Sequence, residues 1–403
     1  MQSNKDQNSK AWTENFDKEH EADYEEEPTF GADNDIKLYD DSGKVTEEGL
    51  QLGKDYNDPM WEDVLDEVTL EEAKKLALHG YTHLEPVPSV GKKQTREVDG
   101  PNQAGSFNVQ TTAIGYPNAS TLAATWNPEL AYNYGKQLGT EAQANNFDGL
   151  YAAGINLHRT PFNGRNYEYW WEDSFLTGTM SAHEIKGGLN VGTYFFMKHF
   201  LNDEQETARD SIYVWETEHN LRQNYLNAFK ICIRKGGLNG IMSSYNRIGS
   251  TWAGGSYALI HNILEKEMGY KGAILTDYAD HHTYMNGDQS LRAGGSVWMD
   301  GYSNNGTFQS GTTASKVFLH SLREATKRNL YIGLNTQYLH SEWVKSGDEG
   351  MITIHRPTPI YWWKYVLIGF DALIVIIDGV WIFFVVRGIR KDKKSAVEKT
   401  QGK

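Results

Sequence analysis

Four apolar, strand-like runs in this chain each end in polar side chains that could do chemistry. The run Gly272 to Thr276 leads into Asp277, a carboxylate placed to act as a nucleophile or general base. The other three runs lead into Arg159 and Arg165, into Lys198 and His199, and into Tyr245 and Asn246. In a parallel β/α barrel the carboxyl ends of all strands face one mouth, so side chains far apart in sequence can meet there. The pattern predicts an enzyme.

Two segments offer groups suited to binding hydroxyls. Asp99 is followed by Gly100 and Pro101, which would hold a turn while the carboxylate points outward. Arg165 could donate two hydrogen bonds to paired hydroxyls while nearby acids such as Glu168 hold it in place. Taken singly, each motif also fits a plain turn or a loop with surface ion pairs, and a lone strand-end histidine is more often structural.

Helix signals alternate with these strands. Asn127 precedes Pro128, which is pre-set for the first helical position, and an amphipathic helix is expected from there to about Asn146. A second is expected over residues 211–235, ending at two glycines, and a third over residues 256–268. Strands alternating with helices predict right-handed βαβ units, and therefore an α/β fold of the (β/α)8 TIM-barrel type.

Composition excludes some classes of protein. Acidic residues outnumber basic ones 53 to 39, and the net charge is −14, so a nucleic-acid partner is not expected. Cys232 is the only cysteine, which excludes a disulfide within the chain and argues against a thiolate metal site.

Composition also divides the chain into segments. We expect an acidic lead or linker over residues 1–59, a barrel over 60–336, a polar linker over 337–360, a transmembrane helix over 361–387 and a basic tail over 388–403. The apolar stretch is long enough to cross a hydrocarbon core about 30 Å thick. Its flanks carry aromatic residues on one side and basic residues on the other: Trp362, Trp363 and Tyr365, then Arg387, Arg390, Lys391, Lys393 and Lys394. By the positive-inside rule the tail is expected in the cytoplasm and the body outside the cell membrane, with the lipid bilayer as a partner.

The order and spacing of the motifs closely resemble glycoside hydrolase family 3, the β-glucosidase and β-xylosidase type, over about residues 61–335. The motifs that carry the resemblance are Asp99-Gly100-Pro101, Gly164 to Glu168 with Glu172-Asp173, Lys198-His199-Phe200 with Asn202, Gln205-Glu206 and Arg209, Met242 to Asn246, and Gly269 to Tyr278.

The resemblance implies retaining hydrolysis of terminal β-glycosidic bonds, with a β-linked glycoside or oligosaccharide as substrate. Asp277 would be the catalytic nucleophile and would form a covalent glycosyl-enzyme, which needs a second carboxyl group about 5 to 5.5 Å away. The residues that would bind the sugar next to the cleaved bond are Asp99, Arg165, Lys198, His199 and Tyr245. No metal or organic cofactor is implied.

The sequence also departs from the family's pattern. Many members carry the general acid/base on an α/β sandwich domain after the barrel, where this chain has a linker and an apolar segment. Other members use a Pro-Gly-His or Pro-Gly-Asp loop, where this chain has Leu201 to Glu204. Since the first eighteen residues have no apolar export signal, we expect a member with reversed domain order, whose sandwich precedes the barrel, or a split protein.

The alternative prediction is a membrane-anchored carbohydrate-binding protein, or an inactive fragment of such an enzyme, that keeps the pocket without turnover.

Overall fold

The computed structural model describes residues 10–105, 109, 111–279, 284–300, 308, 311–335, 344–346, 352–354 and 361–401. The chain divides into two compact units, Met1–Pro357 and Thr358–Lys403. The first unit holds all the predicted site residues.

Parallel strands form the centre of the first unit. Strands β1 (Glu97–Asp99), β2 (Gly149–Tyr151) and β3 (Tyr194–Phe195) pair in that order, and β4 (Met197–Phe200), β6 (Gly240–Ser243) and β9 (Ala273–Leu275) form a second parallel set. Only Phe196 separates β3 from β4, so one run of chain joins the two sets. The parallel pairing expected for βαβ units is therefore present.

Backbone hydrogen bonds close these strands into a ring. Leu275 in β9 forms a parallel bridge with Val297, and the next residue, Trp298, donates to the carbonyl of Ala77 at 2.8 Å. On the other side, Glu97 in β1 donates to the carbonyl of Thr82 at 2.8 Å. Residues 77–82 thus link the last strand segment to the first, and the fold is an α/β barrel.

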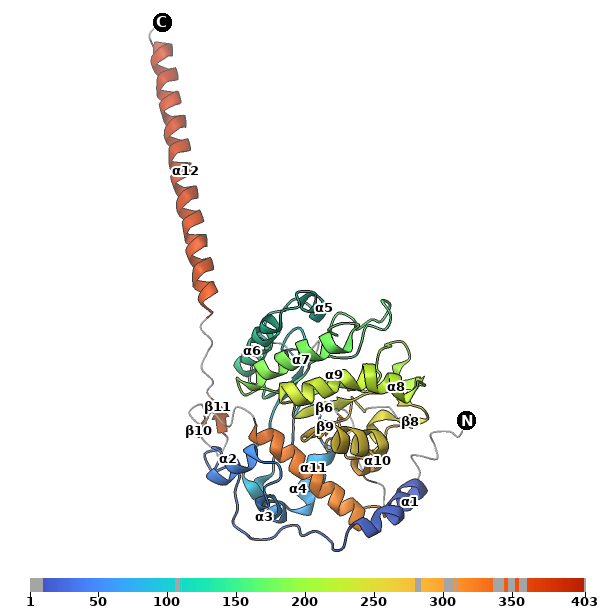
Figure 1. Ribbon diagram of the computed structural model, residues 1–403. Coiled ribbons are helices and arrows are strands. Elements are labelled where there is room, and N and C mark those ends of the chain that lie inside the picture. Colours follow the sequence, from blue (N-terminus) through green and yellow to red (C-terminus); the bar gives the residue numbers. More distant parts are fainter. Residues whose placement is uncertain are drawn as a thin grey trace. The chain divides into compact units, whose positions relative to one another are not determined.

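Helices surround the barrel (Figure 1). The prediction after Asn127 is confirmed: α6 spans Pro128–Ala144, and the Asn127 side chain accepts hydrogen bonds from the amides of Glu129 and Leu130. The helix expected over residues 256–268 is also present, as η7 with π-type hydrogen bonding (Ala258–Glu267). The other helices of this layer are α7 (Ser174–Leu189), α10 (Gly287–Ala293), α11 (Lys316–Leu334) and the short α5 (Ala119–Ala123).

The expected helix over residues 211–235 is wrong at its start. Residues Tyr213–Val214 form strand β5, which pairs with β7 (Arg247–Ile248), and β7 in turn pairs with β8 (Thr251–Trp252). The helical run begins after the N-cap Thr217, whose side chain accepts from the amide of Asn220. It continues as α8 (Glu218–Asn220), η4 (Leu221–Tyr225), α9 (Leu226–Ile231) and η5 (Cys232–Gly236).

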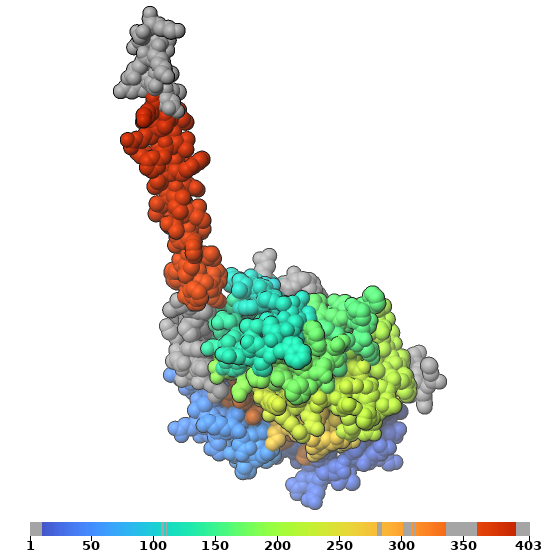
Figure 2. Space-filling model, turned by 45° about the horizontal axis from the view of Figure 1, so that its top comes forward, coloured from blue at the N-terminus to red at the C-terminus, as the bar shows by residue number. Residues whose placement is uncertain are grey.

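The acidic N-terminal segment contains helices and packs on the barrel. Its elements are α1 (Lys10–His20), η1 (Glu21–Asp23) and α2 (Glu47–Lys54), followed by α3 (Met60–Glu67), α4 (Leu70–Leu78) and η2 (Pro88–Val90). Asp17 of α1 pairs with the buried Arg292 of α10, with Oδ2 2.7 Å from Nη2. In the space-filling view this blue segment lies against the rest of the same body (Figure 2). The boundary proposed at residue 59 stays a prediction.

The apolar C-terminal segment forms a single helix, α12 (Trp362–Gln401). Its part Trp362–Lys391 is long and apolar enough to cross a membrane, which on its own is weak evidence for a span. Most of the predicted linker 337–360 lies outside the described residues, except for two short paired strands, β10 (Val344–Ser346) and β11 (Ile352–Ile354).

The short 3-10 turns η3 (Arg209–Ser211) and η6 (Ala253–Gly255) complete the elements of the described chain.

Candidate active site

A pocket of about 800 Å³ opens at the carboxyl ends of the barrel strands. Asp99 comes from the end of β1, Lys198 and His199 from β4, Tyr245 from the residues after β6, and Asp277 from the residues after β9. Arg165 enters from the loop after β2. The structure therefore brings all six predicted site residues together, as expected for a barrel mouth.

One wall of the pocket is a cluster of ion pairs around Lys198. The Nζ of Lys198 lies 2.6 Å from Oδ1 of Asp99 and 3.6 Å from Oε2 of Glu168. Glu168 also accepts a hydrogen bond from Nε of Arg165. Burial lowers the pKa of Lys198, but Asp99 and Glu168 outweigh that effect and raise it, so the lysine is charged.

Asp99 is the member of this cluster that faces the pocket, with 52% of its side chain exposed. The surrounding protein raises its pKa, but Lys198 and Arg165 more than offset this and the pKa lies below its usual value. Gly100 holds the turn with φ of +128°, and a Cβ there would come within 1.7 Å of the Gln103 carbonyl oxygen. Glycine is therefore required at this position.

Asp277 is buried, and three cations act on it. Burial raises its pKa above the usual value, and Arg209, Arg165 and Lys198 offset only part of that rise. Its Oδ1 accepts a hydrogen bond from the amide of Tyr278 at 2.8 Å. The nearby Tyr245 has a raised pKa because of burial and of Asp277, so it is a neutral hydroxyl. The arrangement provides a carboxylate in a pocket of neutral and cationic donors.

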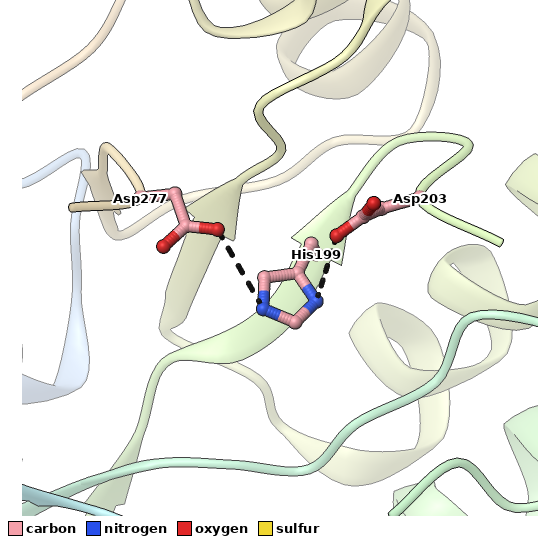
Figure 3. A group of neighbouring side chains, drawn as sticks. All are labelled: His199, Asp203 and Asp277. Carbon is pink, nitrogen blue, oxygen red and sulfur yellow. Dashed lines mark ion pairs between the residues drawn. The ribbon is translucent and has the colours of Figure 1, made fainter. Parts of the chain in front are cut away.

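His199 lies between two carboxyl groups (Figure 3). Its Nε2 is 3.7 Å from Oδ2 of Asp277, and its Nδ1 is 3.6 Å from Oδ2 of Asp203. Burial lowers the pKa of the imidazole, and the cations Arg165 and Lys198 lower it further, so the ring is neutral.

The ligand atoms of these three residues lie within 4.8 Å of one another, close enough to suggest a metal ion. The shortest contacts, however, involve different nitrogens of the ring, because Nε2 lies nearest Asp277 and Nδ1 lies nearest Asp203 (Figure 3). An ion could use only one of these nitrogens.

Sequence reasoning missed the roles of three neighbours of the site. Glu168 was expected only to hold Arg165, yet it also pairs with Lys198. Arg209 was recognised only as part of a motif, yet its guanidinium lies 4.5 Å from the centre of the Tyr245 ring. Asp203 was noted only as a departure from a family pattern. A signal was available for Arg209, because it follows Asp203, Glu204 and Glu206 within six residues, and a cation so close to three acids is expected to pair with a carboxylate.

Comparison with known proteins adds to this geometry. Residues 101–304, about half of the chain, match the model of the glycosyl hydrolase family 3 N terminal domain. A β-glucosidase from Ruminococcus albus is 41% identical over 180 residues, which cover 45% of this chain and 19% of that protein. A β-glucosidase from Bacteroides ovatus is 33% identical over 263 residues, covering 62% of this chain and 34% of that protein.

Solved structures show the same fold. β-Glucosidase 3B from Thermotoga neapolitana, in complex with α-D-glucose, superposes with a TM-score of 0.62 at 28% identity, over 70% of this chain and 43% of that one. A β-glucosidase from Paenibacillus barengoltzii gives a TM-score of 0.66 at 26% identity, over 80% of this chain and 37% of that one. The chain spans about a fifth to a third of the length of the two curated relatives above. It belongs to glycosyl hydrolase family 3, whose N-terminal domain forms the barrel that carries the pocket.

Proposed function

We propose that this protein takes part in retaining hydrolysis of β-glucosides, with Asp277 as the nucleophile. The observation that carries the proposal is a buried carboxylate in a pocket, acted on by Arg209, Arg165 and Lys198. Asp277 attacks the anomeric carbon, the bond to the leaving oxygen breaks, and water later releases the sugar from the ester. The β-glucosidase relatives support glucose as the sugar.

The other pocket residues hold the sugar. Asp99 accepts hydrogen bonds from ring hydroxyls, while Lys198 and His199 donate to them and Arg165 binds a hydroxyl pair. Tyr245 remains neutral and donates close to Asp277. Hydrogen bonds that tighten as positive charge develops on the sugar lower the barrier to reaction.

We propose that the general acid/base comes from a domain outside these 403 residues. The other carboxylates that line the pocket are engaged with cations: Asp99 and Glu168 with Lys198, and Glu206 with Arg209 at 3.2 Å. A carboxylate held in an ion pair is a poor proton donor, because the ionised form is the stabilised one. The relatives' much greater length is consistent with a further domain.

We also propose that α12 anchors the protein in a cell membrane, with the basic tail in the cytoplasm and the barrel outside. The exposed apolar side chains of residues 366–386 and the aromatic and basic residues at its two ends support this placement.

The test is covalent labelling of the full chain in detergent. A fluorinated β-glucoside with an activated aryl leaving group needs little help from a general acid, so the nucleophile can react without its partner. We expect one burst of aryl release and a sugar on the peptide that contains Asp277, detected by mass spectrometry. Asp277→Asn should abolish the label, whereas Asp41→Asn, at an exposed position, should label like the wild type.

Two other outcomes have clear meanings. A label on a different carboxylate would overturn the assignment of Asp277. A folded chain that binds glucose but takes no label would favour the carbohydrate-binding alternative.

A further inference from the structure

One face of the helix α12 differs from the rest of its surface. Between residues 370 and 386 every side chain is Val, Leu, Ile, Phe or Trp except four, which are Asp371, Ala372, Asp378 and Gly379. The helix runs without interruption through these residues (Figure 1). The two Asp-small pairs are seven residues apart, which is almost two helical turns, so all four residues lie on the same face.

Branched side chains complete this face. Ile368, Val375 and Ile382 are also seven residues apart, and each lies next to the aspartates on the helix surface. We call residues 368, 371, 372, 375, 378, 379 and 382 the aspartate face. In two-stranded parallel coiled coils, β-branched residues recur at one position of such a seven-residue repeat. Every residue from 362 to 391 is exposed, so no described part of the chain covers the aspartate face.

A hydrocarbon environment offers the two aspartates nothing to bind. An ionised carboxylate is far more costly there than a carboxylic acid, so each carboxyl group keeps its proton. A carboxylic acid has one O–H donor and an acceptor oxygen, and lipid tails can satisfy neither. A second carboxylic acid at the same depth can satisfy both.

We propose that α12 pairs in the membrane with α12 of a second copy of this chain, in parallel and through the aspartate face. Each aspartate then meets its counterpart across the two-fold axis, and the two acids exchange hydrogen bonds. The inference rests on the membrane anchor proposed above.

Two properties of the face favour a second copy over an unrelated helix. The aspartate side chain is short, and Ala372 and Gly379 beside the acids add no bulk that would hold two backbones apart. Copies inserted in the same orientation also place Asp371 and Asp378 at the depths of their own counterparts. An unrelated helix would need a polar group at both depths.

The first experiment is disulfide cross-linking in membranes that contain two differently tagged full chains. Val375→Cys places a thiol on the aspartate face, between the two acids. Oxidation with copper phenanthroline should join the two tags in one species, at least about tenfold more than in Leu373→Cys, which lies at a similar depth on the opposite side of the helix. The native Cys232 is buried, so the chain without an added cysteine serves as the blank.

Several results would contradict the pair. A chain that resists alkaline carbonate extraction but forms no species with both tags would overturn the pair and leave the anchor intact. Equal cross-linking of Val375→Cys and Leu373→Cys would mean random collision, which also overturns it. A product that joins Val375→Cys to an unrelated protein would overturn the second copy as the partner. Release of the wild type by carbonate would overturn the anchor itself, and the pair with it.

The second experiment tests the hydrogen bonds between the acids. In the Val375→Cys chain, Asp371→Leu with Asp378→Leu should lower the cross-linked fraction at least about fivefold, although the helix then enters the bilayer more readily. Asp371→Asn with Asp378→Asn is the matched control, because an amide also donates and accepts, and it should keep at least about half of the cross-linked fraction. A loss in both double variants, or in neither, would refute the role of the paired acids.

Discussion

At the scale of single residues, Lys198 does the most to hold the pocket together. It is nearly inaccessible and neutralises two carboxylates, Asp99 and Glu168. Lys198→Met leaves both acids without that cation. The cost is below the roughly 3 to 5 kcal/mol of a fully buried broken pair, because Asp99 is half exposed and Glu168 keeps Arg165 as a partner. We expect a lower Tm and, well below that Tm, a labelling rate reduced at least about tenfold. Lys136→Met, at an exposed position on α6, is the control.

A second substitution should restore part of the stability that Lys198→Met loses. Adding Asp99→Asn to Lys198→Met removes one of the two orphaned charges, so the double variant should be more stable than Lys198→Met alone in urea unfolding. If both variants unfold at the same urea concentration, the ion pair does not account for the loss.

Individual site residues were predictable when a strand ended in them. Asp277 and Tyr245 follow apolar runs, and the barrel geometry dictates that such positions share one mouth. Asp99 follows no apolar run, and its prediction depended on the Asp-Gly-Pro turn and on the family resemblance. Asp203 was not predictable in this way. Its place behind His199 depends on how the chain turns after β4, where Asn202 has a φ of +65°. Sequence spacing does not encode that turn.

At the scale of elements, strong local signals gave correct helices and tertiary contacts overrode a weak one. The Asn127 cap and the following proline fixed the start of α6. Residues 211–217 continue an apolar spacing, yet β5 pairs there with β7, because the hydrogen bonds of the added strand outweigh a weak helix preference. The ion pair of Asp17 with Arg292 joins residues that are 275 positions apart, and no local sequence pattern predicts it.

The helix α12 carries the membrane prediction. Asp371 and Asp378 each cost about 2.5 to 3.5 kcal/mol at the centre of a bilayer, and the fifteen Leu, Ile, Phe and Val residues between positions 365 and 386 return about 0.3 to 0.6 kcal/mol each. The cost and the gain nearly balance, so two added arginines should make insertion into the membrane unfavourable.

The full chain, expressed in membranes, should resist alkaline carbonate extraction. Val375→Arg with Ile376→Arg should release it into the soluble fraction. Gly388→Arg, which adds one positive charge at the basic end, should not. Release of the wild type under the same conditions would show that α12 does not anchor the protein in the membrane.

At the scale of the whole molecule, several buried acids make stability depend on pH. Burial raises the pKa of Glu97 to about 7 and that of Glu184 to about 8, in addition to Asp203 and Glu204. Between the unfolded pKa of such an acid and its folded pKa, the unfolded chain releases a proton that the folded chain keeps. The free energy of unfolding therefore falls as pH rises from about 4.5 to about 8.

Glu184 allows this to be measured away from the pocket. It lies on α7, and its Oε2 accepts a hydrogen bond from Nε1 of Trp170 at 3.0 Å. Glu184→Gln keeps that acceptor and removes the titrating proton. The Tm of the variant should match the wild type near pH 4.5 and exceed it by about 3 °C or more at pH 8. Glu19→Gln, at an exposed position on α1, should show no such trend. If the difference in Tm between Glu184→Gln and the wild type stays constant across this range, Glu184 is already ionised in the folded protein. The buried charge then destabilises the barrel at every pH in the range.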